Sequence, residues 1–179
     1  MEAWAVDEHR LGLLPVVRRV WAPRGRRPVA PVRRAYAWLY VYGFVRPRTG
    51  QTWWCLLPTV SVEAMTLALA AFARDEGLDA DQRAVLVVDQ AGWHTSPKLV
   101  LPVGVHLVFR PPYSPELQPA ERLWGPVDEA VANRTFADLG QLQDALADRC
   151  RALERHRPAL KARCRYHWWP HERRKHKPD

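Results

Sequence analysis

The chain has 179 residues, and its 27 Lys and Arg against 19 Asp and Glu give a formal net charge of +8. With 47% hydrophobic residues and 9 Trp, the composition excludes a disordered chain, and the length suits one domain with a small appendage. The apolar runs are shorter than the ~20 residues that cross a bilayer, and the first residues lack the basic and apolar regions of a signal peptide. We therefore expect a cytoplasmic protein with no membrane contact.

The first third of the chain is expected to form antiparallel strands. Aromatic and β-branched residues predict strands, joined by turns that contain Gly or Pro, over residues 4–10, 16–21, 35–45 and 52–57.

After residue 60 the pattern changes to alternating helices and strands. Ser61 is a suitable N-cap for a helix that runs to about Glu76, and its candidate buried residues are Met65, Leu67, Leu69 and Phe72. An apolar run predicts a buried strand over residues 85–88, and a further strand is expected over residues 105–109. Further helices are expected over residues 96–101, 120–132 and 138–155.

This order of elements predicts an α/β domain with a mixed sheet flanked by helices. We expect the domain to comprise residues 1–156, and we expect residues 157–179 to form a basic C-terminal arm that is at most partly ordered.

The basic residues are concentrated in two blocks. Residues 9–62 contain arginines and no acid, residues 149–179 are again basic, and acids outnumber bases between them. Two basic blocks suit a polyanion such as DNA, whereas solvated arginines favoured by codon composition are the structural alternative. The candidate DNA-binding residues are Arg24, Arg26, Arg27, Arg33 and Arg34.

Three acids occupy positions that suit a catalytic site. Asp7 lies on the first strand beside Glu8, Asp89 ends a buried strand, and Glu121 lies in the first turn of a helix. Each alone has a structural alternative, as a turn-forming acid or a helix-dipole partner. Strand alternation allows only one of Asp7 and Glu8 to share a site with Asp89. Carboxylates brought together repel one another, so a cluster of them needs hard cations such as Mg²⁺ or Mn²⁺.

A family resemblance is carried by VDEHRLGLLPVVRRVWAPRGRRP, VLVVDQAGWHTSPK and VHLVFRPPYSPELQPAERLW. These stretches resemble the catalytic core of bacterial insertion-sequence transposases of the Asp-Asp-Glu type, in the mariner-related superfamily. The resemblance covers about residues 4–155 and implies a ribonuclease-H-like fold. It also implies that Asp7, Asp89 and Glu121 are the catalytic residues and hold two Mg²⁺ or Mn²⁺ ions.

The activity implied by the resemblance is phosphodiester hydrolysis and strand transfer at transposon ends. The implied partner is double-stranded DNA, bound by a homodimer associated with the bacterial nucleoid. The family normally carries helix-turn-helix modules before the first catalytic strand, so we expect end recognition to be either missing or supplied by a separate DNA-binding chain. Two alternatives stay open: a truncated or decayed, non-catalytic DNA-binding fragment, and a host nuclease on the same fold.

The chain departs from the family at Gln90 and Gln118, where the family usually has Asn. Gln is a poor helix cap, which predicts that Glu121 is held less firmly.

Further candidates have both a functional and a structural interpretation. His94, Tyr113 and Ser114 are expected to line the site, although a buried histidine and a rigid turn explain them equally well. Asp128 and Glu129 are supporting acids or solvated helix positions. The cysteines and histidines at 150, 156, 164 and 167 lack the paired spacing of a zinc site. The Trp pairs at 53–54 and 168–169 suit core packing or base stacking.

Overall fold

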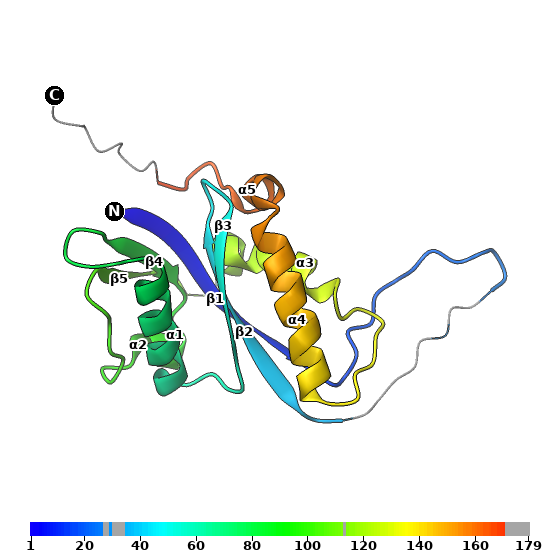
Figure 1. Ribbon diagram of the computed structural model, residues 1–179. Helices are drawn as coiled ribbons and strands as arrows, with labels where there is room; N and C mark the ends of the chain where they lie inside the picture. The colour runs from blue at the N-terminus through cyan, green and yellow to red at the C-terminus, as the bar shows by residue number, and fades with distance from the viewer. Residues whose placement is uncertain (27–28, 30–34, 113, 171–179) are drawn as a thin grey trace.

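A computed structural model of the chain describes residues 1–26, 29, 35–112 and 114–170. The strands are β1 (Glu2–Gly12), β2 (Trp38–Arg46), β3 (Gln51–Leu57), β4 (Ala84–Val88) and β5 (Val105–Phe109). They form one sheet in the order β3-β2-β1-β4-β5. The first three strands pair antiparallel, whereas β4 runs parallel to β1 and β5 parallel to β4. The predicted mixed sheet flanked by helices is therefore confirmed (Figure 1).

The α-helices are α1 (Val62–Asp75), α2 (Gly92–Thr95), α3 (Trp124–Asp128), α4 (Leu139–Glu154) and α5 (Arg157–Cys164). Two short 3-10 helices, η1 (Pro115–Leu117) and η2 (Pro119–Leu123), precede α3. Among the described residues, no helix is both long and apolar enough to cross a membrane.

The central strand β1 divides the protein into two cores. Trp4 and Val6 are buried in the core that α1 covers, whereas Ala5 and Leu11 belong to the core beneath α4 and α5. This division follows from strand geometry, because successive side chains point to opposite faces of the sheet. Asp7 and Glu8 therefore point into different cores.

The two long helices begin at side-chain caps. Ser61 Oγ accepts a hydrogen bond from the Ala64 amide at 3.1 Å, and Asp138 Oδ1 accepts one from the Gln141 amide at 2.9 Å. In α1, the expected residues Met65, Leu69 and Phe72 are fully buried, but Leu67 is 65% exposed. Its prediction was wrong because residue 67 lies on the opposite side of a 3.6-residue turn from residues 65 and 69.

The strand predicted over residues 16–21 is absent from the described structure. The backbone N–H of Asn133 donates to Val16 O at 2.8 Å. The side chain of Asn133 bonds both the backbone N–H and the backbone C=O of Arg18. The side-chain amide of one residue thus satisfies backbone groups that a partner strand would otherwise bond.

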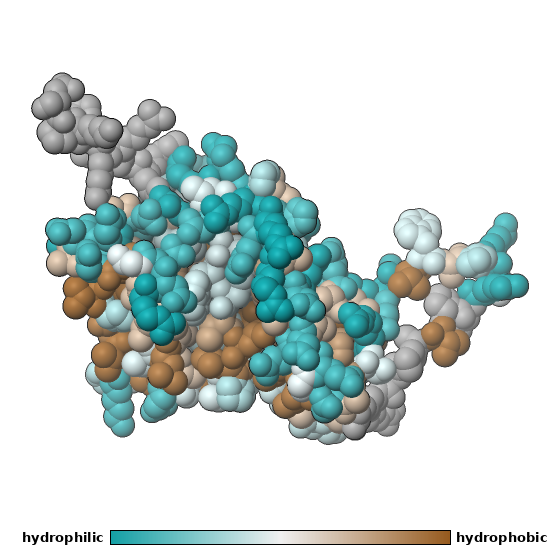
Figure 2. Space-filling model, viewed as in Figure 1, coloured by the Kyte–Doolittle hydropathy of each residue, from teal (hydrophilic) through white to brown (hydrophobic). Residues whose placement is uncertain are grey.

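The described part of the segment after Arg18, residues 19–26, extends away from the body of the protein (Figure 1). Figure 2 shows hydrophilic side chains at the far end of its described part.

The helix predicted over residues 96–101 was also misplaced, because the helical turn is α2, which ends at Thr95. Ser96 has an extended backbone with φ −63° and ψ 133°. It precedes Pro97, and a proline disfavours helical backbone at the preceding residue.

The helix predicted over residues 120–132 is divided into η2 and α3 and ends earlier, at Asp128.

Part of the expected C-terminal arm packs against the domain. Residues 157–164 form α5, and Leu160, Cys164 and Trp169 are buried in the same core as Leu146 of α4. Residues 171–179 lie outside the described residues.

Gly43 of β2 lies opposite Asp7 of β1 and makes room for the indole of Trp124. A Cβ added at Gly43 would lie 2.7 Å from Trp124 Cη2 and 3.1 Å from Trp54 Cζ3. Trp124 is only 6% exposed, so its ring has little space into which it could move.

We predict that Gly43→Ala lowers the free energy of unfolding by about 1–3 kcal/mol, because the added methyl group overpacks the Trp124 contact. Chemical denaturation measures this change. Gly92→Ala is the matched control, since a Cβ there meets no heavy atom within 4 Å, and it should change stability by less than ~0.5 kcal/mol. Equal effects of the two substitutions would contradict the packing argument.

Candidate active site

The parallel pairing of β1 with β4 brings two of the expected acids to the same end of the sheet. Ala5 pairs with Val87, and two residues further along each strand lie Asp7 and Asp89. Asp89 directly follows the last residue of β4, at the carboxyl end of the strand, where open α/β sheets commonly bind ligands.

Asp7 is held by the indole of Trp124. Trp124 Nε1 donates a hydrogen bond to Asp7 Oδ2 at 2.9 Å, and the Trp124 ring stacks on His9 with centroids 4.9 Å apart. His9 Nε2 is in turn 2.8 Å from Asp128 Oδ1, and Arg18 Nη2 is 3.0 Å from Asp128 Oδ2. Asp128 thus contacts His9, His9 stacks on Trp124, and the Trp124 indole orients Asp7.

Burial raises the pKa of Asp7 to about 7, against an ordinary value of 3.8. The hydrogen bond from Trp124 opposes this shift, whereas the negative charges of Glu121 and Glu8 add to it. Asp7 is therefore an acid whose charged form is disfavoured in the metal-free protein, and a bound cation would favour that form.

Glu121 lies in η2, in a loop that is tied to β1. Gln118, the residue before η2, makes no side-chain cap, and instead its Nε2 donates to Val6 O at 2.8 Å. Gln118 is fully buried, so this bond anchors the start of η2 beside Asp7. Glu121 itself is exposed.

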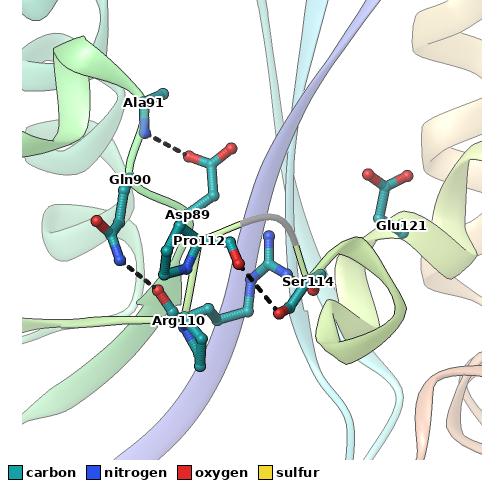
Figure 3. Close-up of a pocket in the computed structure, with 8 residues that line it drawn as sticks. Asp89, Gln90, Ala91, Arg110, Pro112, Ser114 and Glu121 are labelled. Atoms are coloured by element: carbon teal, nitrogen blue, oxygen red, sulfur yellow. Dashed lines mark hydrogen bonds between the residues drawn. The ribbon is translucent and has the colours of Figure 1, made fainter.

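Asp89 and Glu121 line the same open pocket of about 490 Å³ and lie on opposite sides of it (Figure 3). Ser114 and Arg110 also line it. Arg110 is 9% exposed, its guanidinium donates to Ser114 O, and its Nε has no hydrogen-bond partner in the described structure. The pocket therefore combines two acids with a nearly buried cation.

Asp89 has a pKa below its ordinary value. The main cause is a hydrogen bond from His94 Nδ1 to Asp89 Oδ1, at 2.7 Å, and the Ala91 amide also donates to this oxygen at 3.0 Å. His94 is 2% exposed, and its Nε2 lies 3.1 Å from Glu8 Oε1. Burial lowers the pKa of His94, but the bonds to Asp89 and Glu8 outweigh it and raise the pKa to about 9.

The other expected site residues are only partly placed. Tyr113 lies outside the described residues, as do Arg27, Arg33 and Arg34, whereas Arg24 and Arg26 are exposed. The thiols of Cys150 and Cys164 are buried in an apolar core, which raises the pKa of each to about 12. A protonated thiol is a poor zinc ligand.

Sequence reasoning missed the roles of Glu8, Trp124 and Arg110. The sequence pattern presents Glu8 only as an alternative to Asp7, yet Glu8 bonds His94 from the other face of β1. Trp124 lies three residues after Glu121, a helical spacing that brings it back toward the same site.

The donor chemistry of the three acids fits a hard divalent cation, because all their ligand atoms are carboxylate oxygens. Burial and the charge of Glu121 both disfavour the ionised form of Asp7, and such a cation would offset them. Among the described side chains, however, no group of three or more His, Cys, Asp or Glu residues is already assembled as a metal site.

Comparison with known proteins shows the family and the fold. The family described as DDE superfamily endonuclease matches residues 2–143. An uncharacterized protein of Sinorhizobium fredii, y4pE/y4sA, is 44% identical over 102 residues, which are 56% of this chain and 74% of that protein.

Solved structures of the Mos1 transposase share the fold, which is ribonuclease-H-like. The pre-cleavage Mos1 transpososome matches with a TM-score of 0.65 and 16% identity, over 91% of this chain and 54% of that one. The Mos1 mariner paired end complex with Mn matches with a TM-score of 0.64 and 17% identity, over 91% and 53%. The chain thus spans about half the length of these structures.

We predict that Asp7→Asn stabilises the metal-free protein at pH 8 by about 4 kcal/mol, since a shift of one pKa unit corresponds to about 1.4 kcal/mol. The pKa of Asp7 is higher in the folded than in the unfolded protein, so folding binds a proton between about pH 4 and pH 7. Stability therefore falls as the pH rises through this window, and Asn removes the loss while it can still accept the Trp124 bond. The gain should disappear below pH 4, as measured by thermal unfolding in EDTA.

Asp128→Asn is the matched control and should have the opposite sign. Burial raises the pKa of Asp128, but its contacts with His9 and Arg18 outweigh this effect and lower it. Its charge thus stabilises the fold, and the control should destabilise the protein at pH 8. A loss of stability in Asp7→Asn would contradict the prediction.

Proposed function

The chain belongs to the DDE superfamily of endonucleases, and on this basis we propose that it is the catalytic domain of a DNA transposase. In this proposal Asp7, Asp89 and Glu121 are its catalytic acids. It would hydrolyse phosphodiester bonds at transposon ends and transfer the freed 3′ ends to target DNA. The proposal includes a homodimer, working on double-stranded DNA at the bacterial nucleoid.

The observation that carries the proposal is the convergence of three acids from separate parts of the chain. Asp7 and Asp89 follow paired positions of two parallel strands, and Gln118 ties the loop with Glu121 to the residue before Asp7. The charge of Glu121 acts on the pKa of Asp7, and Glu121 shares a pocket with Asp89. The ionised form of Asp7 costs stability in a metal-free protein, which is typical of functional sites.

We propose that these acids hold two Mg²⁺ or Mn²⁺ ions. Such ions activate the attacking oxygen and stabilise the leaving oxygen of a phosphodiester displacement. Structures of Mos1 complexes with Mn and with Mg support this part of the proposal. Trp124 would keep Asp7 Oδ2 in place, and Arg110 would offer a positive charge to a phosphate in the pocket.

The proposal is tested on oligonucleotides that carry the ends of the element, with Mn²⁺ and a helix-turn-helix module added in trans. Asp89→Asn and Glu121→Gln should each reduce cleavage more than about 100-fold. This loss exceeds the one typical of substituting a residue that only hydrogen-bonds a metal ligand. Glu121 is exposed and Gln preserves its size, so Glu121→Gln should unfold at nearly the wild-type temperature. Asp89→Asn loses the charge that bonds His94, so this variant should unfold at a lower temperature but remain folded.

Glu116→Gln is the matched control, because Glu116 is an exposed acid in η1 of the same loop. It should cleave as the wild type does. Binding of the ends without cleavage by the wild type would instead favour the truncated, non-catalytic fragment. Cleavage that survives Asp89→Asn would refute the site.

DNA contact by the first basic block has its own test. Arg24 and Arg26 are exposed in the segment that extends from the domain. If each contacts a phosphate, replacing both by Gln should lower the slope of log K against log salt concentration by about 2, at ~0.9 for each contact. Arg74→Gln is a control, since Arg74 is exposed but pairs with Asp75 on α1. An unchanged slope in the double variant would contradict phosphate contact.

A further inference from the structure

Two acids, one on β1 and one directly after β4, are joined through one buried histidine. His94 Nδ1 lies 2.7 Å from Asp89 Oδ1, and His94 Nε2 lies 3.1 Å from Glu8 Oε1. Glu8 belongs to β1, Asp89 follows β4, and His94 belongs to α2, so three elements meet in this chain of hydrogen bonds.

The inner end of this series of hydrogen bonds, at Glu8 and His94, is buried and fully bonded. The side chain of His94 is 0% exposed and that of Glu8 is 5% exposed, whereas that of Asp89 is 43% exposed. The second oxygen of Glu8, Oε2, accepts a hydrogen bond from Trp93 Nε1 at 3.1 Å. A buried carboxylate held on both oxygens has one orientation, so Glu8 is a rigid anchor for the His94 ring.

At the outer end of this series of hydrogen bonds, Asp89 has one bonded and one open carboxylate oxygen. Asp89 Oδ1 accepts hydrogen bonds from both His94 Nδ1 and the Ala91 amide. In the described part of the chain, Oδ2 has no hydrogen-bond donor, and Asp89 lines the pocket that it shares with Glu121. The two donors on Oδ1 therefore set the rotation of the carboxylate and leave Oδ2 available to a ligand.

We propose that Glu8 is a positioning residue which, through His94, orients the Asp89 carboxylate for a divalent cation. The inference rests on the proposed function, because it takes Asp89 as a metal ligand. Removing a hydrogen-bond partner that orients a metal ligand typically weakens metal binding by about 10- to 100-fold. The adjacent residues Asp7 and Glu8 would then serve one site from opposite faces of β1, one as a ligand and the other as a support.

A simpler interpretation is that Glu8 and His94 only stabilise the core beneath α2. Stability and metal affinity separate the two interpretations. A structural pair would change the unfolding temperature and leave the Mn²⁺ affinity of the folded protein unchanged. A positioning pair changes that affinity, and it does so only while Asp89 is present.

The test measures Mn²⁺ binding to the full chain by electron paramagnetic resonance, without DNA. Glu8→Gln should weaken Mn²⁺ binding about tenfold, since the neutral amide cannot accept both the Trp93 and the His94 bonds well. His94→Asn keeps a donor near the position of Nδ1 but removes the link to Glu8. It should weaken binding to a similar extent, and Glu8→Gln should add nothing to it.

Glu76→Gln is the matched control. Glu76 is a partly buried acid that accepts a bond from Gln51, and it lies near Glu2, the first residue of β1, whereas Asp7 lies in the middle of the strand. It should bind Mn²⁺ as the wild type does. In an Asp89→Asn background, Glu8→Gln should cause no further loss of affinity.

A second measurement uses the metal-free protein. In ¹⁵N–¹H spectra, both ring N–H groups of His94 should be protected from solvent exchange in the wild type. Glu8→Gln should remove protection at Nε2, whereas Glu76→Gln should leave both groups protected. This measurement also applies to a variant that is less stable than the wild type but still folded.

The outcomes separate this inference from the proposed function. Unchanged Mn²⁺ affinity in Glu8→Gln overturns the inference, even if cleavage depends on Asp89. Weaker Mn²⁺ binding in Glu8→Gln supports the inference even if the protein cleaves no DNA, a result that would count against the proposed function alone. A wild-type chain that binds no Mn²⁺ overturns both, and a full effect of Glu8→Gln in the Asp89→Asn background overturns the inference.

Discussion

β1 pairs in parallel with β4 at the centre of the sheet, and both candidate strand acids depend on that pairing. Because Ala5 lies opposite Val87, the residues that follow carry Asp7 and Asp89 to the same end of the sheet. A one-residue slip would point the Asp7 side chain into the other core and put Glu8 in its place. The register is held by apolar residues on both faces of β1, among them Trp4 and Ala5.

The alternation of β1 assigns its two adjacent acids different neighbours. Asp7 faces the core beneath α4 and α5, where Trp124 bonds it and Gly43 leaves room for the indole. Glu8 faces the core beneath α1, where Trp93 and His94 bond it. Each acid thus accepts a hydrogen bond from an indole that packs against one of the two cores, which restricts the motion of its carboxylate. The packing of both cores thereby fixes the two carboxylates at one end of the sheet.

Local patterns predicted the elements whose structure depends on near neighbours in sequence. The capped helices α1 and α4 and the apolar strand β4 lie close to their expected bounds. The failures have longer-range causes. Within residues 16–21, the backbone of Arg18 bonds the side chain of Asn133 instead of a strand, and α5 packs its buried face on a core formed by distant elements. Neither partner could be identified from the local sequence pattern.

The sequence by itself determined the mixed α/β architecture, the family resemblance and the three candidate acids, because residue types, hydropathy periods and spacing along the chain carry this information. Only the tertiary structure decided that His94 joins Asp89 to Glu8, that Trp124 holds Asp7 and that Arg110 lies beside the acids. These contacts join residues of different elements, some of them more than 80 positions apart. Their geometry follows from strand register and side-chain packing, which no local pattern specifies.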